Sequence, residues 1–63
     1  MSKTNVVVQL VGTNGNAFAI MGKVSKALRK AGHGDLVEEY QEESMSGDYN
    51  HLLVTATEYV VVE

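Results

Sequence analysis

The segment Gly12–Asn16 is the first place in the sequence where residue types and spacing could support chemistry. Two glycines and two asparagines lie here between a valine-rich run and a helical pattern. Backbone amides at such a junction can hold a phosphate. The segment matches neither Gly-x-Gly-x-x-Gly nor the Walker loop. We therefore expect a tight turn followed by a helix cap, and an anion- or nucleotide-binding module at this turn is an alternative.

Two histidines, His33 and His51, are the other side chains suited to proton transfer or metal binding. His33 lies between two glycines, as in a surface turn, and His51 could approach Asp48 or Thr55 along a helix. A catalytic histidine needs a nucleophile and an orienting group around a pocket, and the sequence offers no such set. The chain has no cysteine, and its histidines and carboxylates resemble no metal-ligand pattern. We expect no catalytic residue, no cofactor and no metal, and thus a protein that is not an enzyme.

Charges are segregated along the chain. All five basic side chains lie before residue 35 and all eight acidic ones lie at or after it, a separation that the net charge of −3 conceals. Glu38/Glu42 and Glu39/Glu43 are like-charge pairs four residues apart, each costing about 0.2–0.5 kcal/mol in an isolated helix. Despite this cost, negative side chains follow one side of the second helix, and we call them the negative stripe. The candidate partner-binding residues are Asp35, Glu38, Glu39, Glu42, Glu43 and Asp48.

The negative stripe has two interpretations. It is either a solvated face, compensated by the basic first helix alongside, or a docking surface for a positively charged partner, such as the nucleic-acid groove of another protein. Direct binding of DNA or RNA is not expected. Basic residues are few, and no aromatic side chains are interleaved with them.

Hydrophobic patterning predicts an α+β fold with the order β-α-α-α-β in one domain, residues 1–63. The expected strands are 5–11 and 59–62, and the expected helices are 17–31, 35–44 and a third that begins at Ser46 or Gly47. The two terminal strands should pair beside a three-helix core. We expect them to pair antiparallel, because no glycine or proline between Ala56 and Val60 favours a sharp reversal of the chain there.

Residues suited to helix termini support these boundaries. Asn14 or Asn16 can cap the first helix, and Gly32 is placed to end it. Asp35 should cap the second helix, with Glu38 in the reciprocal position of a capping box.

Length and composition limit what this core can support. The chain has 63 residues, 44% of them hydrophobic and 21% charged, and a domain of this size buries only about 60% of its unfolded surface. A deep substrate cavity would remove core volume that it can hardly spare. No apolar run is long enough to span a bilayer, and the first residues lack the pattern of a signal peptide. We expect a cytoplasmic protein without membrane contact, as a monomer or weak homodimer.

Three stretches carry a resemblance to a family of very small phage and prophage proteins: Val11–Phe18, Gly22–Gly34 and Ser46–Leu53. The similarity covers nearly the whole chain, but these motifs form turns, caps and core and carry no known chemistry. In size, acidity and lack of a catalytic set, the chain also resembles phage-encoded anti-CRISPR inhibitors. That resemblance implies a DNA mimic, which presents negative charge to a CRISPR surveillance complex where DNA would lie.

The leading hypothesis is therefore a phage-encoded, non-enzymatic inhibitor that binds a host protein complex. Its acidic second helix would occupy a basic nucleic-acid-binding groove of that complex. The second hypothesis is a small structural homo-oligomer whose terminal strands extend a sheet between copies. The anion-binding turn at Gly12–Asn16 is the third.

Overall fold

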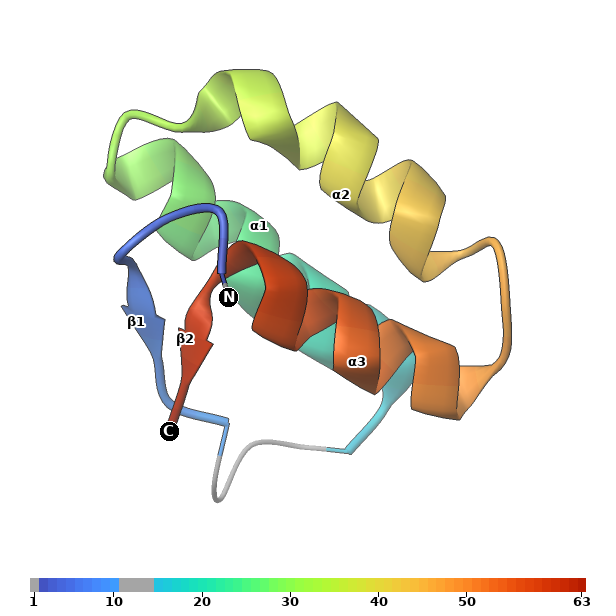
Figure 1. Ribbon diagram of the computed structural model, residues 1–63. Helices are drawn as coiled ribbons and strands as arrows, with labels where there is room; N and C mark the ends of the chain where they lie inside the picture. Colours follow the sequence, from blue (N-terminus) through green and yellow to red (C-terminus); the bar gives the residue numbers. More distant parts are fainter. Residues whose placement is uncertain (1, 11–14) are drawn as a thin grey trace.

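A computed structural model of the chain describes residues 2–10 and 15–63. The described elements follow the expected β-α-α-α-β order, with one short 3-10 turn, η1, before the second helix (Figure 1). Their bounds are β1 Val7–Val8, α1 Ala17–Lys30, η1 Gly34–Leu36, α2 Val37–Ser44, α3 Tyr49–Tyr59 and β2 Val61–Val62. The expected residue Val11 of the first strand lies outside the described residues.

The two terminal strands pair parallel, so the expected antiparallel pairing is wrong. Val7 lies opposite Val61 and Val8 opposite Val62. Helix α2 runs back along α1 and helix α3 runs back along α2, after which the chain enters β2 in the same direction as β1 (Figure 1). A parallel pair needs a long crossover connection, and the three helices supply it.

The turn from α3 into β2 needs no glycine. Val60 takes an extended conformation (φ −135°, ψ 165°) immediately after the last helical residue, Tyr59. Its amide still donates to the Ala56 carbonyl at 3.0 Å, so the end of the helix remains bonded while the chain changes direction. The expectation of an antiparallel pair rested on treating that change as unfavourable.

Helix α1 is held by one apolar face and closed by the expected caps. Four of its apolar side chains are buried at helical spacing: Ile20, Met21, Val24 and Leu28. The Asn16 side chain accepts a 2.8 Å hydrogen bond from the Phe18 amide at the start of the helix. At the end, Gly32 has a φ of 86°, and the amides of Gly32 and His33 donate to the carbonyls of Arg29 and Leu28. This is a Schellman motif, which glycine favours.

Helix α2 begins differently from the prediction. Asp35 lies within η1, and neither η1 nor α2 has a side-chain cap, so the expected capping box of Asp35 and Glu38 is wrong. The reason is the 3-10 turn: the helix proper starts at Val37, two residues after Asp35. The Leu36 amide donates instead to the His33 carbonyl at 3.0 Å.

Helix α3 starts at Tyr49 and is capped by Asp48, whose carboxylate accepts a 2.9 Å bond from the His51 amide. It runs to Tyr59, so that this tyrosine belongs to the helix and not to the last strand. All three helices and both strands contribute to one core. Its buried apolar members are Val8, Ile20, Met21, Val24, Leu28, Val37, Tyr40, Leu52, Ala56, Tyr59 and Val60. Within the described residues, no helix has both the length and the apolarity needed to cross a membrane.

Candidate protein-binding surface

Helix α2 buries one side and turns its glutamates outward. Val37, Tyr40 and Ser44 are buried, whereas Glu38, Glu39, Glu42 and Glu43 are exposed. Gln41, on the α1 side, donates a 3.0 Å hydrogen bond to the Ser25 hydroxyl and fixes the rotation of the helix. We call the four glutamates with Asp35 the acidic face.

Glu39 is used by the fold itself. Its carboxylate accepts a 2.6 Å hydrogen bond from the Tyr59 hydroxyl and a 2.9 Å ion pair from the Lys3 ammonium. Lys3 also lies 4.9 Å from the centre of the Tyr59 ring. The Tyr59 hydrogen bond and then the Lys3 contact lower the pKa of Glu39 below its ordinary value. Glu39 therefore joins α2 to α3 and to the N-terminal segment, and its charge is largely compensated.

Glu43 belongs to a second cluster, where α2 ends and α3 begins. His51 Nε2 lies 2.9 Å from the Glu43 carbonyl oxygen and 3.4 Å from its carboxylate. The Ser46 hydroxyl donates to the same carbonyl at 2.7 Å and lies 3.2 Å from His51 Nε2. A Cβ at Gly47 would come within 2.8 Å of the His51 side chain, so glycine is required by this close approach.

The Ser46–His51–Glu43 cluster has the residue types of a hydrolase triad but not its geometry. In a triad the acid holds one imidazole nitrogen while the other receives the serine proton. Here both Ser46 and Glu43 approach the same nitrogen, Nε2, and the serine hydroxyl has acceptors in the Glu43 carbonyl at 2.7 Å and the Glu43 carboxylate at 3.0 Å. The arrangement positions the α2–α3 turn and does not activate the serine.

Asp35, Glu38 and Glu42 remain available to solvent. Across residues 2–10 and 15–63, no basic side chain lies within ion-pair distance of any of these three carboxylates. The basic side chains of α1 include Lys26, Arg29 and Lys30, and none of these three lies within ion-pair distance of a carboxylate of the acidic face. Part of the face is hollowed to about 280 Å³, lined by Glu39, Glu42, Glu43 and Ser46.

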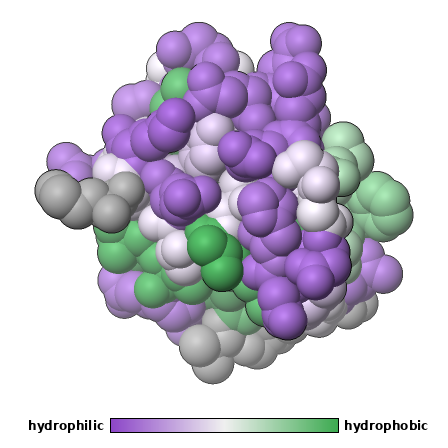
Figure 2. All heavy atoms as spheres, turned by 45° about the vertical axis from the view of Figure 1, so that its right-hand side comes forward, coloured by the Kyte–Doolittle hydropathy of each residue, from purple (hydrophilic) through white to green (hydrophobic). Residues whose placement is uncertain are grey.

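Asp48, the sixth candidate residue, serves as the cap of α3 and is exposed. It lies beyond the acidic face, on the turn that follows α2. Figure 2 shows the side of the molecule that carries this turn: most of it is hydrophilic, with hydrophobic side chains exposed among the polar ones. The structure thus keeps Glu38 and Glu42 together on the outer side of α2, while Glu39, Glu43 and Asp48 also have structural roles.

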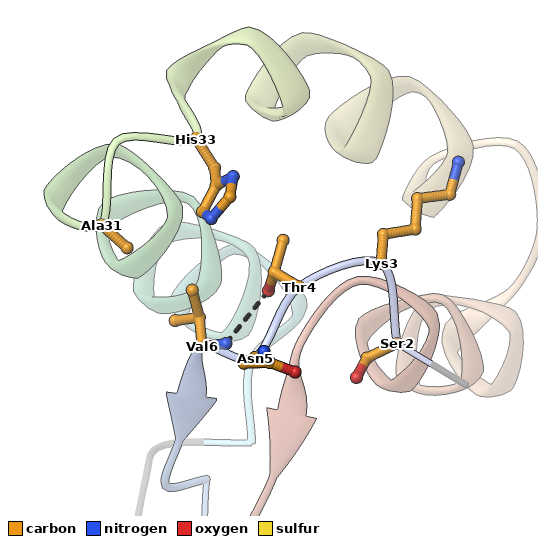
Figure 3. A pocket seen from close by; sticks show the side chains of 7 residues that line it. All are labelled: Ser2, Lys3, Thr4, Asn5, Val6, Ala31 and His33. Atoms are coloured by element: carbon orange, nitrogen blue, oxygen red, sulfur yellow. Dashed lines mark hydrogen bonds between the residues drawn. The ribbon is translucent and has the colours of Figure 1, made fainter.

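A larger hollow of about 480 Å³ lies between the N-terminal segment and the end of α1 (Figure 3). Asn5, Ala31 and His33 line it, and the Thr4 hydroxyl at its edge accepts a 3.2 Å bond from the Val6 amide. Lys3 extends away from this hollow toward α2, where Glu39 binds it. Its ammonium is therefore already paired with Glu39 and does not face this hollow.

The alternative anion site falls mostly on residues that the structure does not describe, since 11–14 lie outside the described ranges. Of the rest of that turn, Asn16 caps α1 and the Gly15 carbonyl accepts a hydrogen bond from the Tyr49 hydroxyl. In the described part of the chain, no three histidine or carboxylate side chains are grouped closely enough to hold a metal ion.

Comparisons with known proteins add no further assignment. No protein-family model, no curated protein and no solved structure matches this chain.

Proposed function

We propose that this protein is a non-enzymatic, phage-encoded inhibitor of the anti-CRISPR type, which binds a host complex through the acidic face. The proposal rests on the position and surroundings of Glu38 and Glu42. They lie one turn apart on the outer side of α2 with no basic partner among the described residues. The repulsion between them is a cost to the folded protein that a cationic partner would relieve.

In this proposal the carboxylates have different roles. Glu38, Glu42 and Asp35 compete with DNA phosphates for a basic groove and steer the encounter. Glu39 and Glu43 hold α2 in place through Tyr59, Lys3 and His51. Such an inhibitor would act in the cytoplasm, where surveillance complexes meet phage DNA.

A matched pair of charge reversals tests the proposal. The double variant Glu38→Lys/Glu42→Lys changes the acidic face, and Glu58→Lys/Glu63→Lys makes the same net change at exposed positions elsewhere. The readout is target-DNA binding by a purified CRISPR surveillance complex, titrated with each protein at low and high salt. We expect wild type to inhibit in a salt-sensitive way, the first variant to lose inhibition and the second to retain most of it. Full inhibition by a folded Glu38→Lys/Glu42→Lys protein would refute the proposal.

A structural homo-oligomer is the second candidate, and one observation favours it. Val7 and Val61 are paired in register on the sheet and are 56% and 39% exposed. A second copy could cover this valine pair or extend the two-stranded sheet at an edge. Sedimentation velocity separates the candidates: a stable dimer at micromolar concentration, lost on Val7→Lys, supports the oligomer, and a monomer excludes it.

A further inference from the structure

An apolar hollow lies next to the acidic face, where the start of α1, the end of α2 and the start of α3 meet. Its volume is about 260 Å³. The large apolar side chains that line it are Phe18, Met21, Met45, Tyr49 and Leu52. Met21 and Leu52 are buried and form part of the core, so the hollow reaches from the surface to the core.

Two large apolar side chains at this hollow are unusually open to water. Phe18 is 74% exposed and Met45 is 60% exposed, more than any other apolar side chain that the structure describes as large and exposed. Each could stabilise a complex by leaving water, since burying a side chain of this kind is favourable. Exposed apolar side chains gathered around a hollow indicate a binding site more strongly than the same residues scattered singly.

The hollow is formed before any partner arrives. The Tyr49 hydroxyl donates to the Gly15 carbonyl, which ties the start of α3 to the segment leading into α1. The Asn16 cap fixes the first turn of α1, and with it the backbone of Phe18. A partner would therefore lose little free energy in ordering this site.

The charges around the hollow select the partner. Asp48 lines it directly, and Glu42 and Glu43 lie within three residues of Met45. Glu42, Glu43 and Ser46 line the hollow of the acidic face. Residues that line the two hollows therefore alternate along the chain, from the end of α2 into the turn that follows it. The amino ends of α1 and α3 contribute only partial positive charges here, which the full charges of Asp48 and Glu43 outweigh.

From this placement we infer that the hollow receives a bulky apolar side chain from a basic segment of the partner protein. The apolar side chain lies among Phe18, Met45 and Tyr49, and its flanking lysines or arginines face Asp48 and Glu42. The inference deepens the proposed function and rests on it. The hollow would provide affinity that the acidic face does not. Exposed charge pairs mainly speed association, whereas a buried apolar side chain gives most of the affinity.

The probe for this site is a short capped peptide, Lys-Arg-Leu-Phe-Arg-Lys, added to the isotope-labelled full chain and followed by NMR. Two matched peptides separate the contributions: one has Ser-Ser in place of Leu-Phe, and one has Glu in place of each basic residue. We expect the first peptide to shift the methyl signals of Met21, Met45 and Leu52. Either replacement should weaken binding by about ten-fold.

Variants on the protein side make the test specific. Phe18→Ala and Met45→Ala remove exposed side chains of the hollow and should each weaken peptide binding by about five-fold or more. Val54→Ala is the control, because Val54 is 57% exposed on α3 and does not line the hollow. The inference would be overturned if Phe18→Ala and Met45→Ala bound the peptide as tightly as Val54→Ala does, or if the glutamate peptide bound as tightly as the basic peptide.

The assay with the surveillance complex distinguishes this inference from the proposed function. If Phe18→Ala and Met45→Ala inhibit as well as wild type while Glu38→Lys/Glu42→Lys does not, the hollow is not part of the interface and the proposed function stands. If the peptide binds the hollow but charge reversal leaves inhibition intact, the proposed function fails. The hollow then remains a site for a basic segment of some other partner.

Discussion

Tyr59 donates a 2.6 Å hydrogen bond from α3 to Glu39 on α2, across residues that lie 20 positions apart in the chain. The Tyr59 ring also packs edge-on against Tyr40, with ring centres 5.3 Å apart. One glutamate of the acidic face therefore stabilises the very helix that presents the others. The contact separates the acidic face into carboxylates that hold the structure and carboxylates that remain for a partner.

Tyr40 and Tyr59 should respond in opposite ways to the loss of their hydroxyls. The buried Tyr40 hydroxyl has at most a weak interaction with the Ser44 hydroxyl and makes no hydrogen bond of normal geometry, whereas the Tyr59 hydroxyl binds Glu39. Tyr40→Phe should leave the free energy of unfolding unchanged or raise it by about 1 kcal/mol, because it removes an unsatisfied polar group. Tyr59→Phe should lower it. Urea unfolding of both variants checks the pair, and a larger loss for Tyr40→Phe would contradict the assignment.

Stability should fall in acid through Glu39. The hydrogen bond from Tyr59, followed by the contact with Lys3, lowers the pKa of Glu39 in the folded protein below 4.5. A carboxylate with a lowered folded pKa contributes stability above its unfolded pKa, and this contribution is lost as pH falls through the lowered value. Thermal melts from pH 7 down to acid should therefore show a decline that starts near pH 4.5.

The matched variant for this pH dependence is Glu39→Gln, which keeps the shape of the side chain but cannot be ionised. Its melting temperature should be lower than that of wild type near pH 7 and should change less in the acid range. If wild type and Glu39→Gln lose stability in parallel, another group is responsible for the acid dependence.

Two glycines should respond oppositely to alanine. Gly47 faces His51, so that an added Cβ would have to displace the imidazole; Gly22 has no neighbouring atom within 4 Å of such a Cβ. Gly47→Ala should cost about 1–3 kcal/mol of stability. Gly22→Ala, in the interior of α1, should add about 0.5–1 kcal/mol. Chemical denaturation measures both, and the His51 ring signals should move in Gly47→Ala alone.

Local sequence signals predicted the parts of the fold that depend on neighbouring residues. The apolar spacing of Ile20, Val24 and Leu28 indicates α1, and Asn16 and Gly32 mark its ends. The capping role of Asp35 was wrong, because a 3-10 turn precedes the helix and no sequence pattern distinguishes that turn from a capped start. The predicted strand direction was wrong for a different reason. The relative direction of the two strands depends on how the three helices between them are arranged, and no local sequence pattern indicates that arrangement.

The residues of the acidic face were predicted from the sequence, but the sequence did not indicate which of them make contacts within the fold. Glu39 meets Lys3 and Tyr59 across 36 and 20 positions, contacts that only the folded chain reveals. The contact between Glu43 and His51 spans eight positions across a turn containing Gly47, and that turn could have suggested it. The apolar hollow was also missed, because Phe18 and Met45 lie far apart in sequence and neither residue alone indicates a binding site.

Glu42 should show a conflict between stability and binding. It lies in the last turn of α2, where the helix dipole disfavours an anion, four residues after Glu38. Glu42→Lys should therefore stabilise the fold by about 0.5 kcal/mol, since it replaces a repulsive pair by an attractive one and places a cation near the carboxyl end of the helix.

The adjacent change, Glu43→Lys, alters net charge by the same amount but should destabilise the fold, because Glu43 contacts His51 and Ser46. Unfolding experiments at low salt compare the two variants, and high salt should reduce the gain from Glu42→Lys. If Glu42→Lys raises stability but abolishes inhibition, the Glu42 carboxylate serves partner binding and lowers the stability of the folded protein. Should it destabilise the protein instead, Glu42 has an internal role, and the acidic face loses its central residue as a docking site.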